Sequence, residues 1–404
     1  AIFVKYMTKV MSSMKFRSVS LKNYKCFDDV ALNFERKDSS IYQWTILLGN
    51  NNTGKTNLLK AIANLRPAGF KFKEKQGYVP AGFLDKARDR KGLSVSCITT
   101  ERSLRNWRYA DNSASGWSEF IEKPFHIFAY GVTRYPSNTS LSESQVGPCD
   151  TLFHTDKRLV NIEEWLMQLD YASKNNNVNA ASRLVKIKEL INGTLFPEIL
   201  DFKFESSDSL HNYVLFKTKD GWFRYNELGF GYQSSLSWII DLSKRLFEAY
   251  QESENPLAES AVVLIDEIDL HLHPRWQRDI VGYLSKAFPG IQFIASTHSP
   301  SVLQSMSDVN LYVMTRKDGK VMVKRSPLTD FNGWSVEEIL RDVMDMNDDI
   351  YSDAYQEYMR LFDAGLDQAD RDKAKAAYSE LLKILHPDNP LRRMLEIQYK
   401  MLIK

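Results

Sequence analysis

Three short segments carry residues whose types and spacing could bind a phosphorylated nucleotide and act on it. The first fits the pattern GxxxxGK[ST] throughout and consists of Gly49, Asn50, Asn51, Asn52, Thr53, Gly54, Lys55 and Thr56. Glycines let backbone amides curl around a β-phosphate, and the N-terminus of a following helix adds its positive end. We expect Lys55 to reach the β- and γ-phosphate oxygens and the Thr56 hydroxyl to bind Mg²⁺. Asn57, the next residue, completes the predicted nucleotide cradle.

The second segment, AVVLIDE at residues 261–267, is an apolar run that ends in two carboxylates. Such a run predicts a strand buried on both faces, and α/β sheets bind ligands at the carboxyl ends of their strands. We therefore expect Asp266 to hold the Mg²⁺ shell and Glu267 to polarise the attacking water. Acidic residues also end buried strands without any function, but the phosphate-binding pattern in the same chain favours the catalytic interpretation.

The third segment, QFIASTH at residues 292–298, is another apolar run with a polar end. A single histidine at a strand end is often only structural. His298, however, follows the acidic strand by one helix, roughly residues 275–287, which places it on the neighbouring strand. We therefore predict that His298 faces the γ-phosphate. The catalytic set is then Lys55, Glu267 and His298.

An α/β fold with a parallel sheet would bring these three segments to one edge. The apolar run 44–48 precedes the glycine pattern, and 57–63 has helical spacing, which gives the strand–loop–helix order that a phosphate loop requires. Other predicted strands are a pair within 15–35 and the runs 92–100, 125–132, 200–205, 212–218, 222–225, 261–265 and 291–296, with an edge hairpin at 311–325. Predicted helices cover 161–194, a long stretch from Ser234, and the chain from Ser335 onward.

Composition sets broad limits on the class of protein. The 404 residues are 43% hydrophobic and 26% charged with a net charge of +2, which suits a globular protein of two or three units and not a globally basic nucleic-acid binder. A local basic stretch at 66–91 could still meet nucleic acid or be simply solvated. The three cysteines form no CxxC pair, and no apolar run approaches the roughly 18 residues of a membrane span. We expect a cytoplasmic protein with no membrane contact.

The order of these motifs resembles the ABC-type ATPase heads of the RecF and SMC class. DEIDLHLHPRWQ at 266–277 and STHSPSVL at 296–303 are similar to those of bacterial anti-phage ATPases, and so is FAYGVTRYP at 128–136. Within that class the chain is most similar to the Septu-type ATPase subunit. The resemblance covers about residues 15–345. It implies ATP and Mg²⁺ as ligands and a head-to-head dimer that closes around ATP.

The resemblance also implies a signature loop that contacts ATP held by the opposite subunit. Residues 227–234 occupy its place, with Gly231, Tyr232 and Gln233 as the expected nucleotide contacts. Gly231 matches the family's essential glycine, but Gly229 stands where the family usually has serine. Backbone amides and the helix dipole survive that change, while one hydroxyl hydrogen bond is lost. A plain helix-capping loop is the alternative.

Several other residues carry open alternatives. By family analogy Arg134 contacts the nucleotide or the signature loop, unless it is a surface arginine, and Gln145 is the candidate for the family's Q-loop glutamine. His271 and His273 lie beside the predicted site, and we do not expect them to ligate a metal. The acidic residues Asp342, Asp345, Asp348 and Asp349 are expected to form solvated surface and not a nuclease site.

The resulting prediction is an α/β P-loop ABC-type ATPase head, with a mixed sheet core and an antiparallel β-lobe. The head spans residues 14–345 and includes a short helical insertion at about 155–197, and residues 346–404 form a C-terminal helical assembly region. Residues 1–13 are taken as a disordered or non-native start. The C-terminal helices could equally pack onto the chain's own head.

The function implied by the resemblance is an ATP-hydrolysing subunit of an anti-phage complex. It would form a homodimer or higher even oligomer and control a separate nuclease effector, with nucleic acid as a further possible partner. Two alternatives stay open: an ATP-gated scaffold that hydrolyses little, and a RecF-like DNA repair ATPase.

Overall fold

The computed structural model describes residues 14–65, 93–100, 104–110, 113–118, 125–137, 146–192, 196, 198–208, 212–346 and 351–403. For 104–110 and 113–118 this description covers the backbone. The start at 1–13, the basic stretch 66–91, Gln145, Asp348 and Asp349 lie outside these residues. The described chain forms two compact units, one up to Trp334 and one from Ser335 onward.

A six-stranded sheet forms the centre of the first unit, in the order β14-β13-β3-β12-β11-β7. Its strands are β3 (Trp44–Gly49), β7 (Ile127–Tyr130), β11 (Val262–Ile265), β12 (Gln292–Thr297), β13 (Asn310–Lys317) and β14 (Lys320–Arg325). All neighbours are parallel except the edge hairpin β13–β14. Parallel pairing places the carboxyl ends of β3, β11 and β12 at one edge, where the three predicted segments meet.

An antiparallel lobe of five strands, in the order β2-β1-β4-β5-β6, packs beside this sheet. It contains β1 (Phe16–Tyr24), β2 (Phe27–Asn33), β4 (Leu93–Thr99), β5 (Leu104–Ala110) and β6 (Ser113–Ser118). Apolar residues of β1, β2 and β4 share one core with α1 (Lys55–Ala63) and β3. Strands β5 and β6 were not predicted, because their sequences lack a clear apolar alternation. Backbone pairing forms them, β5 with β4 and β6 with β5.

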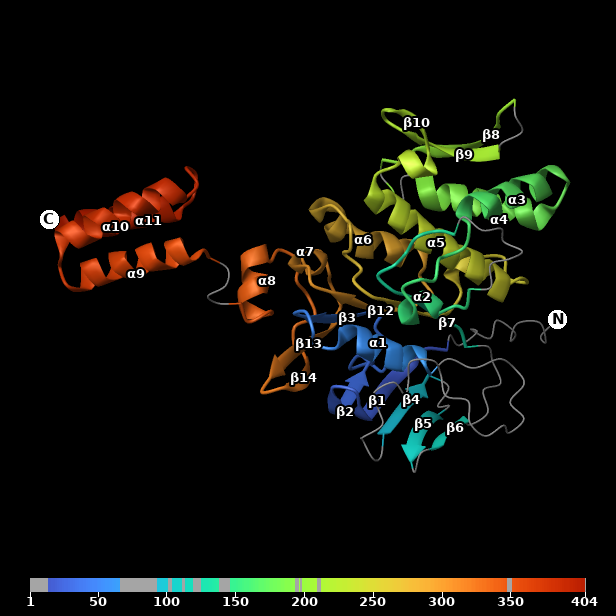
Figure 1. Ribbon diagram of the computed structural model, residues 1–404, viewed down its shortest axis with the longest axis horizontal. Helices are drawn as coiled ribbons and strands as arrows, with labels where there is room; N and C mark the ends of the chain where they lie inside the picture. The colour runs from blue at the N-terminus through green and yellow to red at the C-terminus, as the bar shows by residue number, and fades with distance from the viewer. Residues whose placement is uncertain are drawn as a thin grey trace, which may run out of the picture. The chain divides into compact units, whose positions relative to one another are not determined.

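Helices cover the other side of the parallel sheet (Figure 1). They are α5 (Phe230–Ala249) and α6 (Pro274–Ala287), while the short α2 (Asp150–Phe153) and α7 (Pro300–Leu303) follow β7 and β12. The predicted start of the long helix at Ser234 is wrong, because α5 already begins at Phe230. Its first residues are exposed or half-buried and so carry no apolar periodicity.

A smaller layer follows β7 in the chain and precedes α5. It pairs α3 (Ile162–Lys174) and α4 (Val178–Leu190) with a three-stranded antiparallel sheet of β8 (Asp201–Ser206), β9 (Asn212–Thr218) and β10 (Gly221–Arg224). Asn161 and Asn177 cap the two helices by accepting hydrogen bonds from backbone amides. The 3₁₀ turns η3 (Tyr225–Glu227) and η4 (Pro256–Ala258) flank α5.

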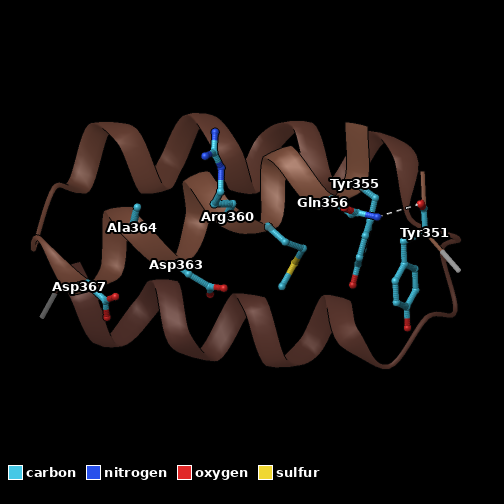
Figure 2. Close-up of a pocket in the computed structure, with 8 residues that line it drawn as sticks. Tyr351, Tyr355, Gln356, Arg360, Asp363, Ala364 and Asp367 are labelled. Carbon is cyan, nitrogen blue, oxygen red and sulfur yellow. Dashed lines mark hydrogen bonds between the residues drawn. The ribbon is translucent and has the colours of Figure 1, made fainter. Parts of the chain in front are cut away.

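The second unit contains α8 (Val336–Asp342), α9 (Asp353–Asp367), α10 (Arg371–Ile384) and α11 (Leu391–Ile403). The last three helices share a core of their own, formed by Phe362, Ala374, Ala377, Leu381, Leu385 and Leu395. A cavity of about 570 Å³ opens on α9, where Tyr351 and Tyr355 stack at 4.5 Å (Figure 2). No helix in the described part of the chain is long and apolar enough to cross a membrane.

Candidate active site

The glycine pattern forms a tight loop between β3 and α1. Its backbone turns through left-handed conformations at Asn52 (φ 63°) and Gly54 (φ 89°). A Cβ on Gly54 would lie 2.7 Å from Cys26 Sγ, so a larger residue does not fit there. The Lys55 ammonium is buried and donates hydrogen bonds to the carbonyl oxygens of Gly49 at 2.7 Å and Asn50 at 3.1 Å.

Side chains around the loop hold its shape from both flanks. Thr53 Oγ1 donates to the Asn50 carbonyl at 2.8 Å, and Lys25 Nζ donates to Asn57 Oδ1 at 3.1 Å. Asn50, Asn51 and Asn52 are exposed. The loop therefore presents backbone amides at the N-terminus of α1, which is the arrangement that binds phosphate.

The two carboxylates at the end of β11 are held by groups from neighbouring elements. Thr56 Oγ1 donates a hydrogen bond to Asp266 Oδ2 at 2.7 Å, and Ser296 Oγ donates to Asp266 Oδ1 at 2.6 Å. The backbone of Glu267 is left-handed, with φ 51°, and its amide donates to Ser296 Oγ at 2.8 Å. Asp266 is buried, whereas the Glu267 side chain keeps 33% of its surface exposed.

His298 lies between the lysine and the second carboxylate. Its Nε2 is 2.9 Å from Lys55 Nζ and 3.9 Å from Glu267 Oε1. Burial, followed by the Lys55 charge, lowers the pKa of His298 below its usual 6.5. Burial likewise lowers the pKa of Lys55. A neutral His298 can accept the lysine proton in a hydrogen bond, whereas an imidazolium would be repelled.

These residues fit a Mg²⁺–triphosphate ligand. The Thr56 hydroxyl and the Asp266 carboxylate are oxygen donors of the kind that Mg²⁺ prefers, and their separation of 2.7 Å is close to the roughly 2.9 Å between neighbouring ligands of an octahedral Mg²⁺. A Cβ at Gly54 would clash with Cys26 and Phe27, so glycine keeps the tight left-handed turn that a phosphate-binding loop of backbone amides requires.

Comparison with protein families agrees with this geometry. The model described as "AAA domain, putative AbiEii toxin, Type IV TA system" matches residues 99–304, about half of the 404-residue chain. The chain belongs to this AAA family. A second model, "AAA ATPase domain", matches residues 14–125.

Curated relatives confirm the expected resemblance to the Septu-type ATPase. The AAA chain is 28% identical to "Septu protein PtuA" of Bacillus thuringiensis over 376 residues, which is 87% of this chain and 91% of the relative. It is 27% identical to "Septu protein PtuA" of Bacillus mycoides (strain KBAB4) over 326 residues, or 80% of this chain, but spans 43% of that relative's length. It is 37% identical to "Retron Ec83 probable ATPase" of Escherichia coli over 136 residues, 33% of this chain and 25% of the relative.

The AAA chain is also similar to parts of solved structures. The SMC head bound to the C-winged helix domain of ScpA has a TM-score of 0.47 and 17% identity, covering 78% of this chain and 98% of that one. The recombination mediator RecF-ATPrS has a TM-score of 0.44 and 14% identity, covering 77% and 98%. The α/β class, the mixed sheet and the helical C-terminal region are as predicted.

The predicted signature loop forms the first turn of α5, with Gly229 as its N-cap. A Cβ on Gly231 would lie 2.5 Å from the His271 carbonyl, so this position needs glycine. The Tyr232 hydroxyl donates to Glu198, and Gln233 Nε2 donates to the Leu228 carbonyl at 2.6 Å. Both side chains are therefore engaged within their own chain, and the amides of Tyr232 and Gln233 donate to the Gly229 carbonyl at 2.9 and 3.1 Å.

The signature tip lines a cavity at the starts of α5 and α6 in the AAA unit. Gly229 and Gly231 line a cavity of about 480 Å³ together with His271, His273 and Trp276, and Lys55 is not among the lining residues. Within one chain, the structure thus brings Lys55, Asp266, Glu267 and His298 together but does not add the signature loop to them.

His271 and His273 each have a partner other than a metal. His271 packs edge-on against Phe230 at 4.6 Å, and His273 Nδ1 accepts a hydrogen bond from the Arg275 amide at 3.3 Å as the N-cap of α6.

Arg134 is the site residue whose position the sequence predicted least well. It is 2% exposed, so the surface alternative is wrong. Its Nε donates to the Gly131 carbonyl at 2.8 Å, and Nη2 donates to the carbonyls of Asp266 and of Glu267, the latter at 2.6 Å. Burial lowers the pKa of Arg134 to about 10, and it remains charged at neutral pH. The two Nη2 hydrogen bonds of Arg134 therefore go to the end of β11.

Sequence reasoning missed Ser296 as a site residue. Its hydroxyl orients Asp266 and Glu267 together from the neighbouring strand β12. The available signal was its place near the end of the apolar run that precedes His298. A serine in a strand shows nothing of its cross-strand partners, so this signal does not distinguish it from an ordinary buried serine.

Proposed function

We propose that this AAA chain is the ATP-binding and ATP-hydrolysing subunit of an anti-phage defence complex. The observation that carries the proposal is the 2.7 Å hydrogen bond from Thr56 to Asp266, which joins the phosphate loop to the acidic strand. The Septu and retron relatives, of which the latter is described as a probable ATPase, support the defence context.

In this proposal each residue has a separate task. The loop amides and Lys55 bind the β- and γ-phosphate oxygens, and Thr56 and Asp266 hold Mg²⁺. Bound Mg²⁺ neutralises phosphate charge. Glu267, which is partly exposed next to the loop, orients a water and accepts its proton. His298, which already lies 2.9 Å from Lys55, reports on the γ-phosphate through that lysine.

Two heads would be needed to complete the site. The N-terminus of α5, with the positive end of the helix dipole, suits a phosphate held by a second copy. The cavity beside the tip is lined by Gly229 and Gly231 but not by Lys55, which supports an arrangement in which each copy supplies half of the site. Closure around ATP would then control a separate nuclease effector.

Turnover and binding assays on the pure protein test the enzymatic proposal. Glu267→Gln removes the base but keeps the shape, so ATP should still bind while turnover falls at least about 100-fold. Lys55→Ala should lose ATP binding itself. Glu252→Gln, on the exposed turn after α5, is the matched control and should behave as wild type. Unchanged turnover in Glu267→Gln with ATP still bound would reject hydrolysis at this site.

Dimer closure has its own test. Glu267→Gln with ATP and Mg²⁺ should sediment as a dimer or higher even oligomer, and the same protein without nucleotide should not gain that species. A monomer under both conditions would reject the head-to-head arrangement while leaving ATP binding intact.

A second candidate is an ATP-gated scaffold that hydrolyses little. Gly229 favours it, because the N-cap of α5 has no side-chain hydroxyl to offer a γ-phosphate. The scaffold predicts tight ATP binding and ATP-dependent assembly with wild-type turnover no faster than that of Glu267→Gln.

A further inference from the structure

Arg134 is a buried cation whose hydrogen bonds end on backbone carbonyls. It follows β7 and reaches across to the end of β11, where its Nη2 donates to the carbonyls of Asp266 and Glu267. A buried guanidinium is costly to desolvate, and a carboxylate partner would be the usual compensation. Here Nη2 alone donates to two consecutive carbonyl groups at the catalytic strand end, while Nε donates to the Gly131 carbonyl and so anchors the guanidinium.

Those two carbonyls flank a strained backbone position. Glu267 has φ 51°, a conformation that a residue with a side chain rarely adopts and that costs of order 1–3 kcal/mol. Ser296 holds its amide from one side, and Arg134 holds its carbonyl from the other. The direction of the Glu267 side chain follows from this backbone conformation, so the two contacts set where its carboxylate points.

The next residue, Tyr135, lies against the tip of α5. Its ring is 5.3 Å from that of Phe230, and Phe230 in turn contacts His271 at 4.6 Å. Arg134 and Tyr135 are adjacent in sequence, so one short segment touches both the catalytic strand end and the signature tip.

We propose that Arg134 is a positioning residue that holds the Glu267 backbone in its left-handed conformation. Tyr135, the next residue, connects Arg134 to the tip of α5 through its contact with Phe230. The proposal rests on the proposed ATPase function. It assigns Arg134 no contact with ATP. When the tip of α5 engages a nucleotide on a second copy, movement of Phe230 reaches Glu267 of its own chain through this segment.

A double-mutant cycle separates positioning from a purely structural role. Arg134→Lys keeps the charge but has no second nitrogen to keep the Nε anchor on Gly131 while Nη2 holds the two carbonyls. A displacement of about 1 Å at a catalytic group can cost about 100-fold in rate. We expect kcat to fall about 10- to 100-fold with KM changed less than about threefold. In the Glu267→Gln background the same substitution should have no further effect, because the group that it positions is already gone.

Arg392→Lys is the matched control. This arginine lies in the second unit. Its guanidinium also donates to the carbonyls of two consecutive residues, Leu385 at 2.6 Å and His386 at 2.9 Å. This variant should retain wild-type kcat. Tyr135→Leu should lower kcat only under conditions in which ATP drives dimer formation, because its effect needs the α5 tip to be engaged.

Three outcomes would overturn the proposal. Additive losses of kcat in the double mutant would mean that Arg134 acts on something other than Glu267. A rise in KM with unchanged kcat would place it on the nucleotide. If Arg134→Lys and Arg134→Gln both fail to fold at 25 °C, its role is structural. Failure of the ATPase proposal itself is distinguished beforehand, because wild type and Glu267→Gln would then turn over at the same rate.

Discussion

Ser296 Oγ lies 2.8 Å from the amide nitrogen of Glu267 and accepts its hydrogen bond across two neighbouring parallel strands. The same hydroxyl donates to Asp266, so one buried side chain orients both carboxylates of the acidic strand. These two hydrogen bonds connect the segment that ends in His298 to the segment that ends in Asp266 and Glu267. The catalytic edge is therefore formed jointly by β11 and β12.

Ser296→Ala should reduce both stability and turnover. The substitution leaves the Glu267 amide and one Asp266 oxygen without this partner, which costs about 1–3 kcal/mol in the free energy of unfolding. Turnover should fall at least about tenfold because Glu267 loses one of its two backbone anchors. Urea denaturation and steady-state ATPase assays measure the two effects.

Ser243→Ala provides the comparison. Ser243 is equally buried, but its hydroxyl donates to the Ile239 carbonyl within α5 at 2.8 Å, and that carbonyl also belongs to the helix ladder. This variant should lose under about 1 kcal/mol and keep its turnover. Equal losses in the two variants would contradict a specific role for Ser296.

Gly229→Ser should raise turnover. A Cβ at this position would lie 3.7 Å from Tyr232 Cδ2, an ordinary contact, and a serine N-cap adds a few tenths of a kcal/mol to helix stability over glycine. Its hydroxyl can hydrogen-bond a γ-phosphate held by the second copy, which is worth roughly tenfold in rate. Phosphate release measures this. An unchanged rate would favour the scaffold interpretation.

Gly231→Ala should disrupt the tip of α5, whereas Gly229→Ser should improve its contact with the nucleotide. Its Cβ would meet the His271 carbonyl at 2.5 Å, and this backbone atom cannot move aside as a flexible side chain could. We expect ATP-dependent dimerisation to be lost while ATP binding at Lys55 persists, as read by sedimentation and by nucleotide binding. Retained dimerisation would show that the tip of α5 does not take part in the closed state.

Turnover should fall on the acid side of pH 6.5. The pKa of His298 lies below this value, so the histidine is neutral above it and protonates as the pH drops through the lowered pKa. A second positive charge then lies 2.9 Å from Lys55 and disrupts the contact. Folding stability contributed by neutral His298 is present above pH 6.5 and is lost as the pH falls, because the unfolded chain takes up the proton first.

His298→Gln separates this titration from those of ATP and the carboxylates. Glutamine cannot take up a proton, so the ratio of wild-type to variant rates should be constant above pH 6.5 and decline below it. A ratio independent of pH between 5 and 8 would assign the acid limb to another group.

Phe362→Ala should loosen the second unit without touching the nucleotide site. Phe362 is fully buried in the core that α9, α10 and α11 share, and its truncation costs about 3–5 kcal/mol. Calorimetry should show a transition that moves to lower temperature, while ATP still binds at Lys55. If assembly depends on this unit, the oligomer should be lost as well. Loss of ATP binding would contradict two separate cores.

The sequence by itself determined the chemistry of the site and the order of the elements that carry it. A glycine pattern between an apolar run and a helix, and two buried runs with polar ends, are local features. Parallel pairing then brings strand ends to one edge without further information. Lys55, Asp266, Glu267 and His298 could be named in this way because their own side chains do the chemistry.

Only the tertiary structure decided what holds those side chains in place. Arg134 was predicted to contact the nucleotide or the signature loop, or to lie at the surface. Its Nη2 instead donates to the carbonyl oxygens of residues 266 and 267, and Ser296 accepts a hydrogen bond from an amide. Every residue except proline carries the same backbone donor and acceptor, so the sequence cannot tell which of them a side chain will reach. The formation of β5 and β6 has the same cause, since β5 arises from backbone pairing with β4 and β6 from pairing with β5.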